Sequence, residues 1–298
     1  MFRIGYIGLG LMGKPICRNL MKSGYPLIVF NRSKAVMEEL ASEGAKTASS
    51  PAEVARQVDI IFTNLPDSPD VEKVVLGEGG ILEGSHPGLI YVDNSTIKPA
   101  TARMLAEILA DRGIDALDAP VSGGEIGAIN GTLTIMVGGS EEALKIALPV
   151  LEAIGKIITH IGGPGSGQIA KAANQIMVSA QMIAMAELLV FSQKAGADPH
   201  KVVEAIKGGS AQCWTLDVKP PRLFYGNRTP GFKARMQAKD LNIVLETARE
   251  YAIPLPATAL GSQLFDAMVA EGMGDQDNSA VIAILEQLAG VTLQEIKS

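Results

Sequence analysis

The chain has 298 residues, of which 47% are hydrophobic, 4% aromatic and 19% charged, and its formal net charge is −6. A chain of this length predicts about two domains. The composition excludes a disordered tail and a nucleic-acid-binding module dominated by Lys and Arg, so we expect no nucleic-acid partner. Because an acidic chain repels phosphate on average, a phosphorylated ligand has to be held by a helix N-terminus or by individual basic residues.

The cysteines and histidines give no sign of a disulfide framework or a metal site. Cys17 and Cys213 are too few for a framework, and His86, His160 and His200 add no metal-ligand spacing. We therefore expect no bound metal.

The N-terminal segment and the apolar stretches argue against a membrane protein. We see no signal-peptide pattern before the first expected strand. The longest apolar stretch, 176–191, contains Ser179, Gln181 and Glu187, which favours a buried helix over a membrane span. We expect a cytoplasmic protein without a membrane partner.

Up to residue 163 the chain alternates short aliphatic runs with helical patterns, which predicts a parallel sheet with crossover helices. The expected strands are 4–8, 27–30, 59–63, 89–93, 115–119, 132–137 and 156–161. A glycine-rich cluster at 162–167 then precedes a stretch, 168–195, that has neither Gly nor Pro and holds helix formers at helical spacing. This stretch predicts one long helix.

Further helices are expected after the long one, at 199–207, 238–251, 257–271 and 280–288. Asp198 and Pro199 suit the N-cap and first position of the first of these. The expected fold class is therefore α/β. A Rossmann-like, doubly wound sheet occupies residues 1–163, and an all-helical domain that begins with the long interdomain helix occupies residues 164–298.

A glycine-rich run follows the first expected strand: Gly8, Leu9, Gly10, Leu11, Met12 and Gly13. The first glycine permits a tight turn, the second lets the backbone approach a pyrophosphate, and the third allows close packing of helix on strand. In the first βα unit of an alternating chain, this run predicts dinucleotide binding.

The end of the second expected strand bears on cofactor choice. NAD-binding folds usually place an acidic residue there, on the ribose 2′-hydroxyl, whereas this chain has Asn31, Arg32 and Ser33. Asn31 removes the carboxylate that would repel a 2′-phosphate, and Arg32 and Ser33 offer donors to it. NADPH is favoured, and NAD remains possible, since the alternative for Arg32 is a solvated loop residue with no role in selectivity.

Five ordered segments resemble the β-hydroxyacid dehydrogenase family, whose members include 3-hydroxyisobutyrate dehydrogenase and tartronate semialdehyde (2-hydroxy-3-oxopropionate) reductase. They are GYIGLGLMGKPICRNLMKSG (5–24), DNST (93–96), DAPVSGGEIGAINGTLTIMVGG (118–139), GSGQIAKAANQ (165–175) and KDL (239–241). The resemblance covers nearly the whole chain. It implies an N-terminal Rossmann domain, a helical C-terminal domain, an active site between them, and a homodimer or homotetramer.

The resemblance also implies roles for individual residues. It places Leu65, Pro66 and Thr96 beside the cofactor, although Thr96 also suits a helix N-cap near Ile97. The substrate carboxylate would be bound by Ser122, Gly123 and Gly124, whose turn can present backbone N–H groups to an anion. Lys239 corresponds to a family position near the nicotinamide, where its charge assists the cofactor or the carboxylate, or it is an ordinary helix surface residue.

Lys171 is the expected catalytic residue. Hydride transfer to an aldehyde leaves an alkoxide that needs a proton. No histidine falls in a motif, whereas Lys171 occupies the family's proton-transfer position. Asn174 at i+3 and Gln175 at i+4 lie on the same face of the expected helix and complete the catalytic set, and the sequence leaves open which of the two contacts the substrate. Many family members have a second Asn where this chain has Gln175, and the Asn-Gln form is more similar to tartronate semialdehyde reductases.

The expected function is therefore NADPH-dependent reduction of a small carboxylate-bearing semialdehyde, with tartronate semialdehyde, which gives glycerate, as the first choice. The alternatives are 3-hydroxyisobutyrate dehydrogenase, succinic semialdehyde (4-hydroxybutyrate) reductase and, more remotely, a cofactor sensor without turnover. An imine reductase is disfavoured by Lys171, and a decarboxylating 6-phosphogluconate dehydrogenase by the short helical domain. Trp214 and Phe232 are candidates for the substrate pocket or for interdomain packing.

Overall fold

The computed structural model of the chain describes residues 1–294. The chain divides into two compact units, residues 1–171 (unit 1) and 172–298 (unit 2). This division falls inside the long helix, whereas the boundary expected after residue 163 lies before that helix begins. The expected boundary stays a prediction.

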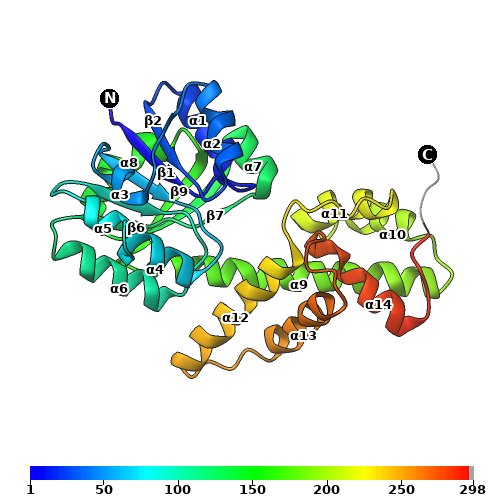
Figure 1. The fold of residues 1–298 in the computed structure, drawn as a ribbon. Coiled ribbons are helices and arrows are strands. Elements are labelled where there is room, and N and C mark those ends of the chain that lie inside the picture. Colours follow the sequence, from blue (N-terminus) through cyan, green and yellow to red (C-terminus); the bar gives the residue numbers. More distant parts are fainter. Residues whose placement is uncertain (295–298) are drawn as a thin grey trace. The chain divides into compact units, whose positions relative to one another are not determined.

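Unit 1 is built on one nine-stranded sheet (Figure 1). Its strands are β1 Ile4–Ile7, β2 Leu27–Phe30, β3 Lys46–Thr47, β4 Ile60–Thr63, β5 Ile90–Asp93, β6 Asp115–Asp118, β7 Val121–Ser122, β8 Leu133–Gly138 and β9 Gly155–Gly162. Their order is β3-β2-β1-β4-β5-β6-β8-β7, and β9 pairs with β8. The strand order reverses between β1 and β4, which is where open α/β sheets bind ligands.

The expected parallel sheet contains antiparallel pairs near one end. Strand β8 runs antiparallel to β6 and β7, while all other pairs are parallel. A parallel return needs a crossover of a dozen or more residues, and residues 123–132 between β7 and β8 are too few for one. The chain therefore turns back beside the strand it has just left.

Helices cover both faces of the sheet, as a doubly wound fold requires (Figure 1). They are α1 Gly13–Lys22, α2 Lys34–Ser42, α3 Pro51–Ala55, α4 Ser68–Leu76, α5 Ile81–Gly84, α6 Pro99–Ala110, α7 Gly124–Asn130 and α8 Glu141–Leu151. One core cluster packs α1, α2, α7 and α8 on the sheet, and the other packs α3 to α6 on it. The Rossmann-like fold class is confirmed.

Unit 2 is helical, as expected. Its elements are the greater part of α9 Ser166–Lys194, then α10 Pro199–Ile206, α11 Trp214–Phe224, α12 Ala234–Glu250, α13 Pro256–Ala270, the 3₁₀ helix η1 Asn278–Val281 and α14 Ile282–Ala289. Asp198 caps α10 as expected, because its carboxylate accepts from the backbone N–H of His200 at 2.9 Å. The sequence analysis missed α11, because Pro220 and Pro221 lie inside it.

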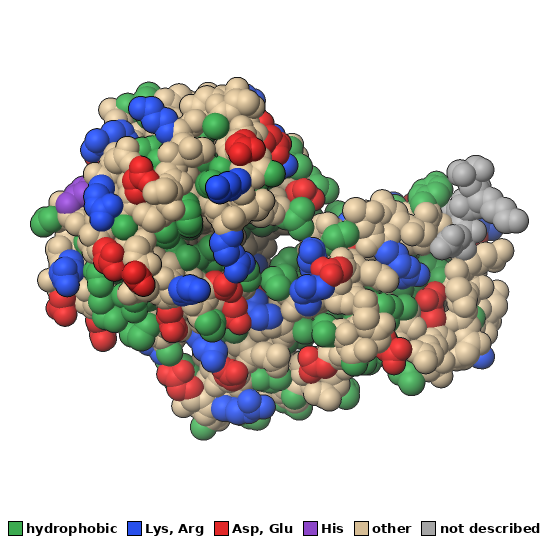
Figure 2. All heavy atoms as spheres, in the orientation of Figure 1, with side chains coloured by type: hydrophobic (Ala, Val, Ile, Leu, Met, Phe, Trp, Pro, Cys, Tyr) green, Lys and Arg blue, Asp and Glu red, His purple; other side chains and the backbone are tan. Residues whose placement is uncertain are grey.

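The 29-residue helix α9 is long and apolar enough to cross a membrane by length and composition alone. Its inward face, however, supplies Met182, Met185, Ala186 and Leu189 to the core of unit 2, each at most 1% exposed. Lys and Arg side chains are interspersed with Asp and Glu over the visible face of each unit (Figure 2). The helix is thus a core element of unit 2.

Candidate active site

The glycine-rich run forms a tight loop between β1 and α1. Gly8 has φ +97°, and a Cβ there would lie 2.2 Å from the carbonyl oxygen of Asn64. A Cβ at Gly13 would lie 2.0 Å from the carbonyl oxygen of Gly8. The packing of unit 1 itself therefore requires glycine at both positions.

Gly10 is different, because a Cβ at this position would meet no atom within 4 Å and its φ is not in the left-handed region. The protein's own packing gives no reason for glycine at position 10, whereas close approach of a pyrophosphate does. The side chain of Met12, the N-cap residue of α1, makes no capping bond, so the first turn of α1 can present N–H groups to an anion. The loop fits a dinucleotide.

Asn31 ties the end of β2 to this loop. Its Oδ1 accepts from the backbone N–H of Leu9 at 3.1 Å, and its Nδ2 donates to the carbonyl oxygen of Ser33 at 3.4 Å. The neighbouring Arg32 is exposed, and within residues 1–294 its guanidinium makes no ion pair or hydrogen bond. The three residues expected to select the cofactor thus lie at the carboxyl end of β2, beside the glycine loop.

The loops after β4 and β5 are fastened to each other at the same edge. The backbone N–H of Leu65 donates to Ser95 Oγ at 2.8 Å, which brings the Leu65–Pro66 turn beside the residue before Thr96. Thr96 is not a helix N-cap, contrary to one expectation. Helix α6 begins at Pro99 after the N-cap Lys98, because the fixed φ of proline suits the first helical position.

The Ser122-Gly123-Gly124 segment forms the turn between β7 and α7. Ser122 ends the short strand β7, Gly123 has φ +130°, and Gly124 has φ +61° and begins α7. Gly123 is exposed and Ser122 and Gly124 are half-buried. The backbone of this segment is therefore accessible to a ligand.

Lys171 lies in the second turn of α9 and is only 7% exposed. The same helix carries Asn174 and Gln175, one turn further along. Upstream, Gln168 clasps the loop after β5: its Oε1 accepts from the backbone N–H of Ile97 at 3.1 Å, and its Nε2 donates to the carbonyl oxygen of Ser95 at 2.8 Å. Lys171 thus follows a helical turn that is attached to the loop containing Thr96.

In unit 2, Asn174 and Gln175 belong to a polar chain that joins α9 to α12. Asn174 Nδ2 donates to Gln175 Oε1 at 2.8 Å, and Gln175 Nε2 donates to Asp240 Oδ2 at 2.5 Å. Lys239 Nζ lies 2.8 Å from Asp240 Oδ1. Gln175 and Asp240 are each 2% exposed, whereas Lys239 is half-buried. This polar chain sets the positions of Asn174, Gln175 and Lys239, which are three of the expected site residues.

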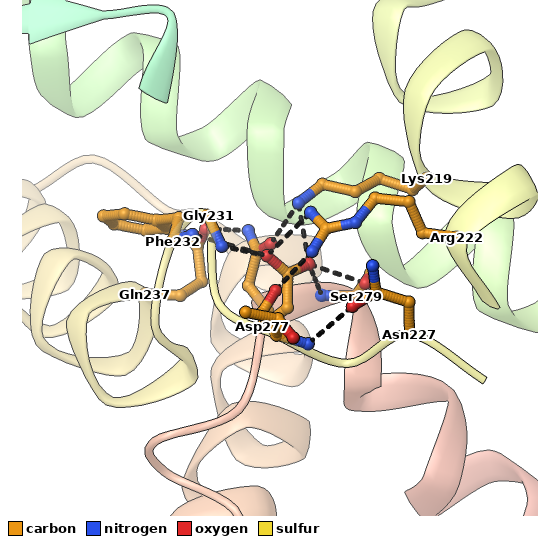
Figure 3. Close-up of polar contacts among 10 residues, drawn as sticks. Lys219, Arg222, Asn227, Gly231, Phe232, Gln237, Asp277 and Ser279 are labelled. Atoms are coloured by element: carbon orange, nitrogen blue, oxygen red, sulfur yellow. Dashed lines mark hydrogen bonds and ion pairs between the residues drawn. The ribbon is translucent and has the colours of Figure 1, made fainter. Parts of the chain in front are cut away.

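Phe232 lies in a segment that a buried carboxylate holds in place (Figure 3). Asp277 Oδ2 accepts from the backbone N–H groups of Gly231 at 2.9 Å and Phe232 at 3.3 Å. Its Oδ1 accepts from Lys219 Nζ at 2.7 Å. Burial by itself raises the pKa of Asp277, but the Lys219 ammonium, together with hydrogen bonds from Ser279 and the backbone N–H of Gly231, holds that pKa below its usual range. Trp214 is 55% exposed.

Sequence reasoning missed four side chains that hold neighbouring segments in place: Gln168, Asp240, Asp277 and Asp118, whose carboxylate accepts from the backbone N–H groups of Gly165 and Gln168. Asp118, Gln168 and Asp240 lie inside the DAPVSGG, GSGQ and KDL segments. These motifs marked them as part of the family pattern but did not indicate which residues they contact. Asp277 lies in no such segment. Within residues 1–294, no group of three or more His, Cys, Asp or Glu side chains is placed to hold a metal ion.

Two family models cover the chain. The "NAD binding domain of 6-phosphogluconate dehydrogenase" matches residues 3–162, and the "NAD-binding of NADP-dependent 3-hydroxyisobutyrate dehydrogenase" matches residues 165–285. The chain is 43% identical to the 2-hydroxy-3-oxopropionate reductase of Escherichia coli over 96% of this chain and 98% of that protein. It is 40% identical to the 2-(hydroxymethyl)glutarate dehydrogenase of Eubacterium barkeri, over 98% and 97% of the two chains.

A solved structure agrees with these relatives. The 3-hydroxyisobutyrate dehydrogenase of Mycobacterium tuberculosis, described with L-serine, has a TM-score of 0.87 and 31% identity, and the match covers 96% of this chain and 99% of that one. The matches to both halves of the chain, the glycine loop and the fold thus indicate the same family. The chain belongs to the 3-hydroxyisobutyrate dehydrogenase-like β-hydroxyacid dehydrogenase family and is an NAD(P)-dependent oxidoreductase that interconverts a hydroxyacid and its semialdehyde.

Proposed function

We propose that this enzyme reduces tartronate semialdehyde (2-hydroxy-3-oxopropionate) to glycerate with NADPH, and that Lys171 is the proton donor. The observation that carries the proposal is the placement of Lys171, which is 7% exposed and follows a helical turn clasped by Gln168 to the loop after β5. Ligands of open α/β sheets bind at the carboxyl ends of such strands. This placement supports a role for the lysine beside the substrate and the nicotinamide.

The chemistry follows from this placement. Bound NADPH supplies the hydride to the aldehyde carbon. Lys171 Nζ donates a hydrogen bond to the carbonyl oxygen, stabilises the negative charge that develops there, and then transfers its proton to that oxygen. Ser122 and the backbone N–H groups of Gly123 and Gly124 bind the substrate carboxylate.

The polar chain in unit 2 supports the choice of substrate. A carboxylate only accepts hydrogen bonds, so Gln175 presents its NH₂ group to Asp240 and its carbonyl oxygen to the NH₂ group of Asn174. We propose that Gln175 orients the Asn174 carboxamide through this bond and that Asn174 contacts the C2 hydroxyl of the substrate.

Two similar proteins give independent support for the choice of substrate. The E. coli relative is named for 2-hydroxy-3-oxopropionate, and the M. tuberculosis structure is described with L-serine. L-Serine is a 3-hydroxy acid with a polar group on C2, as glycerate is. Both fit a site that contacts a polar substituent at that carbon.

For the cofactor we propose NADPH over NADH. Asn31 leaves the end of β2 without a carboxylate, and the exposed Arg32 beside it offers a planar donor fork that matches a phosphate.

We further propose that the enzyme acts in the cytoplasm as a homodimer or homotetramer. Large apolar side chains on the outer face of α9, Met177 at 58% exposure and Phe191 at 73%, support self-association. Light scattering after gel filtration measures the oligomeric state, and a monomer would contradict that part.

A steady-state screen tests the proposed reaction. Tartronate, methylmalonate and succinic semialdehydes are each assayed with NADPH and with NADH, and kcat/KM values are compared. A site that hydrogen-bonds a hydroxyl rejects an analogue lacking it by roughly 10⁴–10⁵. We expect tartronate semialdehyde with NADPH to give the highest value. A preference for methylmalonate semialdehyde would indicate a 3-hydroxyisobutyrate dehydrogenase, a preference for succinic semialdehyde a 4-hydroxybutyrate enzyme, and either result would refute the substrate assignment.

A further inference from the structure

Asp118, the last residue of β6, presents a buried carboxylate to the start of α9. Its side chain is 6% exposed. Oδ1 accepts from the backbone N–H of Gly165 at 2.7 Å, and Oδ2 accepts from that of Gln168 at 2.8 Å. The first N–H groups of a helix have no partner inside the helix. One carboxylate from a neighbouring strand therefore satisfies two donors at the start of the helix that carries Lys171.

The backbone is built for this close contact. Asp118 ends β6, and Met136 lies in β8. A Cβ at Gly167 would lie 2.5 Å from the carbonyl oxygen of each of these two residues. Any side chain at position 167 would push the helix away from the strand ends. The first turn of α9 thus lies directly against the sheet.

The first turn of α9 is also attached to the loop after β5. Gln168 donates its backbone N–H to Asp118 and uses its side chain to bond Ser95 and Ile97. Lys171 comes three residues later, on the adjoining part of the helix surface. The Asp118 carboxylate therefore fixes the helical turn from which the Lys171 side chain extends.

We propose that Asp118 is a positioning residue of the reaction, which sets where the Lys171 ammonium lies by holding the first turn of α9 to the end of β6. This inference rests on the proposed role of Lys171 as proton donor. It assigns Asp118 no contact with substrate or cofactor. Its effect on turnover passes through the lysine alone.

The electrostatic surroundings make the contact sensitive to pH. Burial raises the pKa of Asp118 to about 6, the two backbone donors act against this effect, and the nearby Asp93 adds to it. The other polar groups near Asp118 are Tyr91 on β5, which lines the same small cavity, and Arg103 on α6, which lies beside Gly165. Strand β8 has no charged residue, and those of α8 are exposed. Protonation of Asp118 gives one oxygen a hydrogen and removes one of the two acceptors.

Kinetics of four variants test the proposal, with tartronate semialdehyde and NADPH as substrates: Asp118→Asn, Asp118→Glu, Lys171→Ala and the double variant of Asp118→Asn with Lys171→Ala. Asp115→Asn, at the exposed start of the same strand, is the matched control and should keep its activity. Asn keeps the shape of Asp118 but presents an NH₂ group to one of the two donors. We expect Asp118→Asn to lower kcat at least about tenfold, with NADPH affinity within about twofold of wild type, and Asp118→Glu to recover part of the loss.

Two readouts separate positioning from a purely structural effect. The double variant should be no slower than Lys171→Ala alone, because residues that act as one unit are not additive. The acid limb of the wild-type kcat profile, with a midpoint near 6, should be absent in Asp118→Asn. Unchanged kcat in Asp118→Asn, or a double variant slower by the product of the two single effects, would overturn the proposal.

A chemical measurement keeps this test apart from that of the proposed function. The rate of Lys171 acetylation by a small reagent, followed by mass spectrometry, should differ between wild type and Asp118→Asn and stay unchanged in Asp115→Asn. If Lys171→Ala retains turnover, the proton-donor assignment fails, and the acetylation rates alone then decide whether Asp118 positions the lysine. Should Asp118→Asn fail to fold, Gln168→Met, which removes only the second attachment, carries the same kinetic and labelling comparison.

Discussion

Gln175 Nε2 donates a hydrogen bond of 2.5 Å to Asp240 Oδ2, and this bond joins α9 to α12 in the interior of unit 2. The other end of the same carboxamide accepts from Asn174. A side chain with both ends engaged in this way orients its neighbours. Gln is one methylene longer than Asn, and it can serve at position 175 because both ends of its carboxamide have partners.

Replacing Gln175 with Leu should destabilise the protein and weaken substrate discrimination. The buried Asp240 loses a donor, which costs about 1–3 kcal/mol in the free energy of unfolding. Asn174 loses the bond that orients it, so the preference for tartronate over methylmalonate semialdehyde should narrow about tenfold or more in kcat/KM. Urea unfolding and steady-state kinetics measure the two effects. Gln287→Leu, at an exposed position of α14, is the control and should change neither.

Replacing Asn31 with Asp should shift the cofactor preference toward NADH. The carboxylate can still accept from the Leu9 N–H, so the glycine loop keeps its contact, but it repels a 2′-phosphate. We expect NADPH to weaken relative to NADH by about 1–3 kcal/mol. Titration of both cofactors measures the ratio. A wild-type enzyme that already prefers NADH would show that Arg32 plays no part in selection.

The sequence predicted the elements that follow local patterns. The alternating strands, the glycine loop and the long helix could be read from periodicity and from glycine spacing, and the structure agrees on them. The antiparallel strand β8 and helix α11 could not be read in this way. The first depends on the length of a connection, and the second keeps a helical path through two prolines because of tertiary packing.

The candidate site divides along similar lines. Motif context indicated Lys171, Asn174 and Ser122. It could not indicate that Asp118 and Gln168 fasten the start of α9, because those bonds join residues 47 to 73 positions apart in the chain. Partners at such separations depend on how the strands are ordered in the sheet, and no local pattern encodes that order.

Removing the charge of Asp277 should strongly destabilise unit 2. Lys219 is 4% exposed and loses its counter-charge in Asp277→Asn, which costs about 3–5 kcal/mol for a buried pair. Adding Lys219→Met to Asp277→Asn should recover much of that loss, because no buried charge is then left alone. Denaturant unfolding measures both variants. Lys207→Met breaks an exposed pair with Glu204 and serves as the control, with an effect within about 1 kcal/mol. Equal losses in the single and double variants would contradict the ion-pair account.

Asp118 should make the stability of the protein fall as pH rises. Its pKa is raised from 3.8 to about 6 in the folded state, so the folded chain binds this proton more tightly than the unfolded chain. The stabilising contribution is present below pH 3.8 and is lost as pH rises through about 6. Relative to Asp118→Asn, the wild type should lose roughly 3 kcal/mol between these limits. Urea unfolding at pH 4, 5, 6 and 7 checks this, and a difference that is constant with pH would contradict it.

The most direct test of the account is the turnover of Lys171→Ala with tartronate semialdehyde and NADPH. General acid catalysis contributes about 10²–10⁴ in rate, so kcat should fall by at least two powers of ten. NADPH affinity should stay within about twofold of wild type, because the glycine loop and Asn31 lie outside the change. Turnover at the wild-type rate would contradict the assignment of Lys171 as the proton donor.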